Sequence, residues 1–132
     1  MKGQETLFSS KSDHWSTPKE VYKRLDLEFG FDYDPCPLNA NFDSLKINWG
    51  KKCFVNPPYS NIKEFVKHGQ ECLLNGTKLI VWLVPARTDT KWFHEYFYNK
   101  PKTEIRFIKG RLKFGDSKNS APFPSMIVIQ HG

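Results

Sequence analysis

The tetrapeptide Asn56-Pro57-Pro58-Tyr59 has the residue types needed to activate an amino group on an aromatic base. Such an amine is a poor nucleophile because its lone pair is delocalised into the ring. The side-chain oxygen of Asn56 and a neighbouring backbone carbonyl can accept both amine protons, which returns the lone pair to the nitrogen. The two prolines lack N–H groups and stiffen the acceptors, and Tyr59 offers a face for stacking an extruded base. The alternative is a polar Pro-Pro turn after a strand.

Two predicted strands end at polar residues of this kind. Lys52–Val55 is typical of a short buried strand, and Pro57 and Pro58 prevent its continuation. Phe31–Asp34 alternates like a second short strand, which Pro35 stops at Asp34. Open α/β sheets bind ligands at the carboxyl ends of their strands. The pattern therefore places Asp34 and Asn56 at a ligand-binding edge, although Asp34 could instead cap a turn.

Helices must alternate with these strands. Thr17-Pro18-Lys19-Glu20 has the pattern of a capped helix start, and Gly30 ends that helix. A second helix begins near residue 62 and closes at Asn75-Gly76. The apolar run Lys78–Val84 is typical of a central parallel strand buried on both faces.

The C-terminal third continues the alternation of helices and strands and holds most of the net positive charge. Thr88 or Asp89 is expected to cap a short aromatic helix, and strands are expected at 104–108, 111–114 and 126–129. Residues 100–118 contain seven basic and two acidic residues, against 13 and 12 in the rest of the chain. Three of these basic residues would share one face of a strand and could contact a polyanion such as nucleic acid, namely Lys109, Arg111 and Lys113. A solvated hairpin is the alternative.

Length and composition limit the class of protein. With 132 residues the chain is one domain, which we expect over 15–132 behind a flexible arm of residues 1–14. No apolar run approaches the ~20 residues of a membrane span, and the N-terminus lacks the apolar core of a secretory signal. Three cysteines without a CxxC pair favour buried thiols in a reducing cytoplasm, and no zinc site or other metal site is expected.

Several blocks in fixed order resemble the phage-type DNA N-6-adenine methyltransferase (Dam) family over about residues 8 to 130. The Asn56–Tyr59 motif itself looks like that of amino-group methyltransferases that use S-adenosylmethionine. The blocks are Trp15-Ser16-Thr17-Pro18, Asp34-Pro35-Cys36, Asn56-Pro57-Pro58-Tyr59-Ser60, Val84–Thr90, Lys109–Gly115 and Ala121–Ser125.

The resemblance implies roles for the matching residues. Asn56, Pro57, Pro58 and Tyr59 would be catalytic. The cofactor, S-adenosyl-L-methionine, would be held by Trp15, Thr17, Pro18, Asp34, Pro35 and Cys36. By its place between Asp34 and Asn56, Asp43 is a candidate for the ribose hydroxyls, or else a solvated loop acid. Double-stranded DNA would be contacted by Arg87, Lys109, Arg111, Lys113, Phe114 and Phe123. For Phe114 and Phe123 the alternative is core packing, and for Arg87 it is an ion pair with Asp89.

The sequence departs from most such methyltransferases in one segment. Asp34 and Asn56 are only 22 positions apart, with no glycine between Tyr33 and Trp49. We therefore predict a compact α/β, Rossmann-like methyltransferase domain with a mixed, mostly parallel sheet flanked by helices, reduced by about one βα unit. It would act as a monomer or weak dimer in the bacterial cytoplasm. Two alternatives stay open: methylation of an RNA base or a protein amide, and a degenerate domain that only binds nucleic acid.

Overall fold

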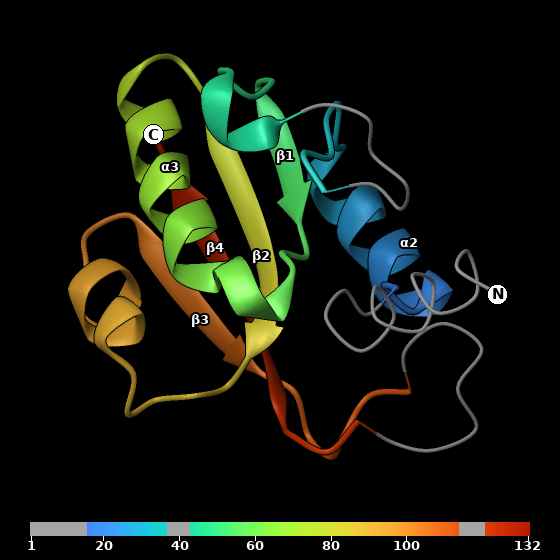
Figure 1. Cartoon of the computed structure of the whole chain (residues 1–132). Coiled ribbons are helices and arrows are strands. Elements are labelled where there is room, and N and C mark those ends of the chain that lie inside the picture. The colour runs from blue at the N-terminus through green and yellow to red at the C-terminus, as the bar shows by residue number, and fades with distance from the viewer. Residues whose placement is uncertain (1–15, 37–42, 114–120) are drawn as a thin grey trace, which may run out of the picture.

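The computed structural model describes residues 16–36, 43–113 and 121–132 (Figure 1). The predicted arm, Trp15 and Phe114 lie outside the described residues. In chain order the helices and longer strands are α2 (Lys19–Phe29), β1 (Lys52–Val55), α3 (Ile62–Leu74), β2 (Leu79–Pro85), β3 (Thr103–Phe107) and β4 (Ser125–His131). Single-turn helices occupy Ser44–Lys46, Tyr59–Asn61 and Phe93–Phe97. The alternation of helices and strands confirms the predicted α/β class.

The four strands form one mixed sheet in the order β1-β2-β4-β3. Strands β1 and β2 are parallel, whereas β4 is antiparallel to both of its neighbours. Strands β1, β2 and β3 therefore run in one direction, as their arrowheads show in Figure 1, and β4 runs against them. The mixed sheet is confirmed, but the expectation of mostly parallel pairing is wrong for the described strands. Strand β4 begins beside the carboxyl ends of β2 and β3, where Met126 pairs with Val84 and with Phe107, and it runs back from there.

Helices cover both faces of the sheet (Figure 1). On one face α3 and the π-helix Phe93–Phe97 pack on the side chains of Ile80, Trp82, Val84, Met126 and Val128. On the other face α2 places Leu25 against Phe54, Val81, Leu83, Ile127 and Ile129. Every residue of β2 is buried, which confirms the predicted central strand. This burial holds the carboxyl ends of β1 and β2 in a rigid frame.

The predicted strand at Phe31–Asp34 is reduced to one parallel bridge between Tyr33 and Cys53. The Asp32 amide donates to the Lys52 carbonyl at 2.9 Å, and the Phe54 amide donates to the Tyr33 carbonyl at 3.0 Å. Because this segment runs parallel to β1, Asp34 and Asn56 leave the sheet at the same edge. The prediction that Asp34 and Asn56 lie at the same edge of the sheet is thus confirmed, although the element before Asp34 is shorter than the predicted strand.

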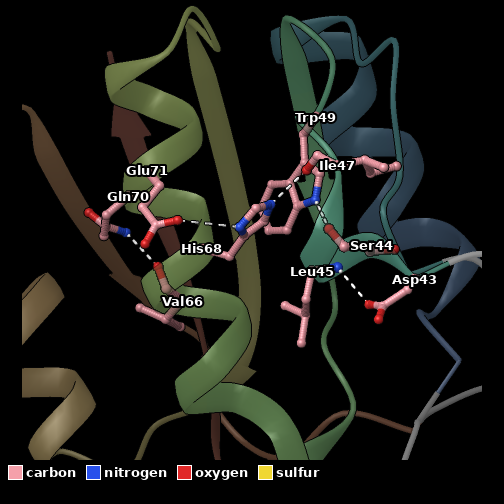
Figure 2. A network of polar contacts seen from close by, with 9 residues as sticks. All are labelled: Asp43, Ser44, Leu45, Ile47, Trp49, Val66, His68, Gln70 and Glu71. Carbon is pink, nitrogen blue, oxygen red and sulfur yellow. Dashed lines mark hydrogen bonds and ion pairs between the residues drawn. The ribbon is translucent and has the colours of Figure 1, made fainter.

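The segment between Asp34 and β1 contains a single-turn helix, Ser44–Lys46, and no strand among its described residues. Trp49 holds it in place through its indole N–H, which donates to the Ser44 carbonyl at 3.0 Å. Figure 2 shows His68 of α3 beside this segment, with its Nε2 2.6 Å from the Ile47 carbonyl oxygen and its Nδ1 3.6 Å from Glu71. His68 therefore fastens the shortened segment to α3, in keeping with a structural histidine.

The short aromatic helix forms as predicted but with a different cap. The Thr90 hydroxyl, rather than Thr88 or Asp89, accepts from the Phe93 amide at 3.3 Å. In the part of the chain described here, no helix has the length and apolarity needed to cross a membrane. The same part holds no cluster of His, Cys, Asp and Glu side chains arranged for a metal ion.

Candidate active site

Asn56 lies directly after β1 at the carboxyl edge of the sheet and is 3% exposed. Its side-chain Nδ2 donates to the Thr17 hydroxyl oxygen at 3.1 Å. After Asn56 the buried Pro57 and half-buried Pro58 carry the chain away from the sheet, and the Pro58 carbonyl accepts from the Asn61 amide at 2.9 Å. The single turn Tyr59–Asn61 then leads into α3. The two prolines and the Thr17 contact thus fix Asn56 from both sides.

Thr17 does not cap helix α2. The residue at the cap position is Pro18, and no side chain caps the helix. The Thr-Pro-x-Glu pattern predicts a capping hydroxyl, but this pattern takes into account only neighbouring residues in the sequence. In the fold that hydroxyl bonds to Asn56, which lies 39 positions away in the chain.

A cavity of about 400 Å³ opens beside this pair, between the start of α2 and the Asp34 segment. Its lining residues are Ser16, Thr17, Lys19, Tyr22, Asp34, Cys36 and Phe54. Three residues predicted to hold a cofactor are among them: Thr17, Asp34 and Cys36. Pro18 and Pro35 are chain neighbours of lining residues, and neither lines the cavity itself.

Sequence reasoning missed four of the lining residues: Ser16, Lys19, Tyr22 and Phe54. The helical spacing of Val21, Tyr22, Leu25 and Phe29 predicts one apolar face, whereas Tyr22 is 36% exposed and pairs edge-on with Phe54 at 5.1 Å between ring centroids. The available signal was helical periodicity, since Lys19 and Tyr22 lie three positions apart on α2 and therefore on one face.

Asp34 is the acidic group of the cavity. Its Oδ1 accepts from the Cys36 amide at 2.8 Å. Burial raises the pKa of the Asp34 carboxyl above its usual value, and the Cys36 hydrogen bond offsets part of that shift. A bound cation would stabilise the carboxylate in the same place. Burial and the nearby Asp34 charge also raise the pKa of the Cys36 thiol, which therefore stays protonated and is not a nucleophile.

Asp43 does not line the cavity. Its side chain caps the turn Ser44–Lys46 by accepting from the Leu45 amide at 3.0 Å, as Figure 2 shows, and it lies 3.9 Å from Lys46. The residue is exposed. Its placement is that of a loop acid with a local capping role, the alternative left open by the sequence.

Tyr59 and Phe123 come together across the edge of the sheet. Their ring centroids are 5.0 Å apart at an interplanar angle of 75°. Burial raises the pKa of Tyr59, and the positive charge of Arg87 offsets part of the shift. Among the described residues no ion pair joins Arg87 to Asp89. Phe123 is 8% exposed and belongs to the core on the α2 face, in keeping with the core-packing alternative, and its contact with DNA stays a prediction.

Lys109, Arg111 and Lys113 are all exposed, but they do not lie on a strand. The predicted strand at 111–114 is wrong for its described part, because pairing with β4 ends at Phe107 and no further strand offers a partner. Gly110 turns the chain with a positive φ of 76°. Half-buried Leu112 then packs inward and its carbonyl accepts from the Ala121 amide at 2.8 Å. The exposed basic side chains are therefore carried by a turn that follows β3 at the carboxyl edge of the sheet.

Comparison with known proteins gives concordant matches. The family model described as DNA N-6-adenine-methyltransferase (Dam) matches residues 4–131. The DNA N-6-adenine-methyltransferase of Haemophilus phage HP1 (strain HP1c1) is 28% identical over 138 residues, covering 91% of this chain and 79% of that protein. The DNA N-6-adenine-methyltransferase of Escherichia phage T1 is 35% identical over 113 residues, covering 76% of this chain and 46% of that protein. The resemblance found in the sequence is thereby confirmed, and the chain belongs to the DNA N-6-adenine-methyltransferase family.

Proposed function

We propose that this protein transfers a methyl group from S-adenosyl-L-methionine to the exocyclic N6 amine of adenine in double-stranded DNA. The observation that carries the proposal is the placement of Asn56. Its buried amide is bonded to Thr17, and Thr17 lines a cavity that also contains Asp34. Membership of the family indicates the reaction, since the two named phage relatives are DNA N-6-adenine-methyltransferases.

The chemistry of the cavity fits the amino-acid part of this cofactor, which carries an ammonium and a carboxylate. Asp34 is suited to accept from the ammonium, and Lys19 and the Thr17 hydroxyl are suited to the carboxylate. The start of α2 favours an anion at the same place, because the first N–H groups of a helix have no acceptor within it. Tyr22 and Phe54 add flat apolar surface. When bound, the cofactor supplies a methyl group on a positively charged sulfur.

The residues of the chain would act by positioning and electrostatics. Asn56 Oδ1 would accept a hydrogen bond from one N–H of the adenine amine, and a backbone carbonyl of the following prolines would accept from the other, which raises the nucleophilicity of the nitrogen. Tyr59, supported by Phe123, stacks the extruded base. No covalent intermediate on the enzyme is required, in agreement with the protonated Cys36 thiol.

The phosphate backbone would be held by cations around this edge. Arg87 is exposed and its charge acts on Tyr59, and the turn 109–113 carries Lys109, Arg111 and Lys113 in exposed positions. Phosphate contacts fix register and orientation of a protein on a duplex. The basic turn thus favours a nucleic-acid substrate over a protein amide.

The arrangement of the sheet supports a compact, single-domain Rossmann-like fold over residues 15–132. Three of the four strands run in one direction, helices cover both faces, and the cavity lies at the carboxyl edge. The short segment before β1 stands where a full βα unit is expected, so the pocket we propose does not include Asp43. The three cysteines are free and buried, which supports a reducing cytoplasm, and we expect a monomer or weak dimer.

The proposal is tested by incubating the purified protein with methyl-labelled S-adenosylmethionine and either unmethylated duplex DNA or RNA. The nucleic acid is then digested and the labelled nucleoside identified. We expect the label in N6-methyldeoxyadenosine from the DNA, and little label in nucleosides from the RNA. Label only in RNA would favour the RNA alternative. A folded protein that labels neither, and whose melting temperature does not rise with millimolar cofactor, would instead be a binding domain, because occupancy at 100 times Kd stabilises by about 2.7 kcal/mol.

A further inference from the structure

The hydrogen bond between Thr17 and Asn56 connects two functions that the sequence separates by 39 positions. Thr17 lines the cavity, while Asn56 follows β1 and is the residue proposed above to bind the adenine amine. We propose that Thr17 is a positioning residue that couples occupation of the cavity to the orientation of the Asn56 amide. This inference rests on the proposed function and adds a coupling between its two binding events.

The argument begins with the two ends of the Asn56 amide. Only its oxygen can accept a proton of an adenine amine, whereas its nitrogen presents two donors that would repel that amine. In the structure Nδ2 is the end directed at Thr17, at 3.1 Å. This orientation assigns Oδ1 to the substrate.

A threonine hydroxyl by itself does not enforce that orientation. Its oxygen accepts hydrogen bonds, but its proton can also be donated, so it can pair with either end of an amide. The choice is removed when a second group takes the hydroxyl proton. The oxygen of Thr17 is then left as an acceptor, and Nδ2 is the end of the amide that pairs with it.

The cavity is placed to provide that second group. Thr17 shares it with Lys19, the one cation among the described lining residues, and with the start of α2. Both favour a carboxylate close to the Thr17 hydroxyl. A carboxylate bound there accepts a hydrogen bond from the Thr17 hydroxyl. It therefore favours the orientation of the Asn56 amide in which Oδ1 is available to the substrate. By linkage, adenine bound to that amide strengthens carboxylate binding by the same factor.

The absence of a side-chain cap on α2 is consistent with this role. A threonine before Pro18 has the sequence context of a capping residue, yet its hydroxyl is engaged with Asn56 and α2 has no side-chain cap. The Thr17 hydroxyl thus stabilises the position of Asn56 and not the start of α2. Positions where a local rule fails in this way are expected at functional sites.

The test measures binding without methyl transfer. A fluorescent, adenine-containing duplex is titrated with the full chain in three states: alone, with S-adenosylhomocysteine, and with S-adenosyl-3-thiopropylamine, which lacks only the carboxylate. For the wild type we expect S-adenosylhomocysteine to tighten DNA binding about 5- to 150-fold, and the decarboxylated ligand to do so much less. The Asn56 side-chain NH₂ resonances, assigned by their loss in Asn56→Ala, should shift with the first ligand only.

Two substitutions isolate the hydroxyl. Thr17→Val is isosteric and removes it, so the tightening should vanish and kcat should fall at saturating cofactor. Thr17→Ser keeps it and should restore both. Thr103→Val is the matched control, because it removes a half-buried threonine hydroxyl that contacts Pro101 and Gln130 at the opposite edge of the sheet. Melting temperatures verify that each variant is folded.

The outcomes separate the two proposals. If Thr17→Val raises only KM for the cofactor and leaves kcat and the DNA tightening intact, Thr17 is a simple binding residue and the coupling is overturned. Equal tightening by both ligands in the wild type also overturns it. A wild type that transfers no methyl group to any nucleic acid and binds no S-adenosylhomocysteine overturns the proposed function, and the coupling with it.

Discussion

Two buried amides at opposite ends of the sheet show how neighbours decide the role of one chemical group. Asn56 and Gln130 are each 3% exposed. Gln130 Oε1 accepts from the Trp82 indole at 3.0 Å and from Gln70 at 2.8 Å, and its Nε2 donates to the Tyr96 carbonyl at 3.1 Å. Its partners come from α3, β2 and the π-helix, so Gln130 joins the sheet to the helices that pack on one of its faces. Asn56 bonds instead to a residue that lines a cavity.

The difference follows from position in the sheet. Gln130 pairs with Ile80 and Thr103, near the amino ends of β2 and β3, where helices close over the sheet. Asn56 leaves the sheet at the carboxyl end of β1, where open α/β sheets have their ligand crevice. We therefore expect Gln130 to determine stability and Asn56 to determine chemistry. The predictions below test that division.

The largest effect is expected for Asn56→Ala. It removes the acceptor that acts on the amine in the transition state, so methyl transfer should fall by about 10²- to 10³-fold or more. DNA affinity in the absence of cofactor and the melting temperature should change little, because most of the effect of the amide is made in the transition state, whereas the tightening of DNA binding by S-adenosylhomocysteine should be lost with the amide. Asn61→Ala, at an exposed position whose side chain caps no helix, is the control. A large loss of folded protein in Asn56→Ala would make the amide structural, like that of Gln130.

Asp34→Asn should weaken cofactor binding by about 10- to 100-fold, the value of a lost charge-assisted hydrogen bond. Because burial raises the Asp34 pKa, wild-type affinity should fall as the pH drops through that raised pKa, where the carboxylate takes up a proton. The variant should lose this dependence. Calorimetric titration with S-adenosylhomocysteine between about pH 4 and 7 measures both effects. An unchanged pH dependence in the variant would remove Asp34 from the ammonium site.

Gln130→Ala should lower the free energy of unfolding by about 1–3 kcal/mol, because the buried indole N–H of Trp82 and the Gln70 amide lose their partner. Urea unfolding measures the loss. Below the melting temperature the rate of methyl transfer should stay near that of the wild type. A variant of normal stability with a much lower rate would contradict the division between the two amides.

The smallest effect is expected at the basic turn. Lys109→Ala combined with Arg111→Ala should weaken DNA binding and reduce the slope of log K against log salt by about 2, while kcat at saturating DNA stays unchanged. Lys63→Ala combined with Lys67→Ala is the matched control, since both lysines are exposed on α3. An unchanged salt slope in the first variant would place the turn outside the interface.

Local patterns were sufficient for the elements that carry the site. The prolines after Val55 and Gly30 after α2 mark where those elements end, and the apolar run before Pro85 identifies the buried central strand. From these, the common edge of Asp34 and Asn56 followed. The family resemblance added the reaction.

Tertiary contacts decided what local patterns could not. The Thr17 hydroxyl has the sequence context of a cap, and only the fold brings it to Asn56. The basic residues 109–113 alternate as in a strand, yet none of the strands that the structure describes pairs with them. The insertion of β4 between β2 and β3 depends on the path of a connection, which residue propensities do not encode.

The most direct test of this account follows Asn56→Ala and Gln130→Ala through one turnover on the same DNA. Both variants are held at a temperature at which urea unfolding shows them folded, and N6-methyladenine is quantified over time. The account predicts a well-folded Asn56→Ala that forms almost no product and a destabilised Gln130→Ala that forms product at the wild-type rate. Wild-type product formation by Asn56→Ala would contradict the assignment of the chemistry to the amide at the end of β1.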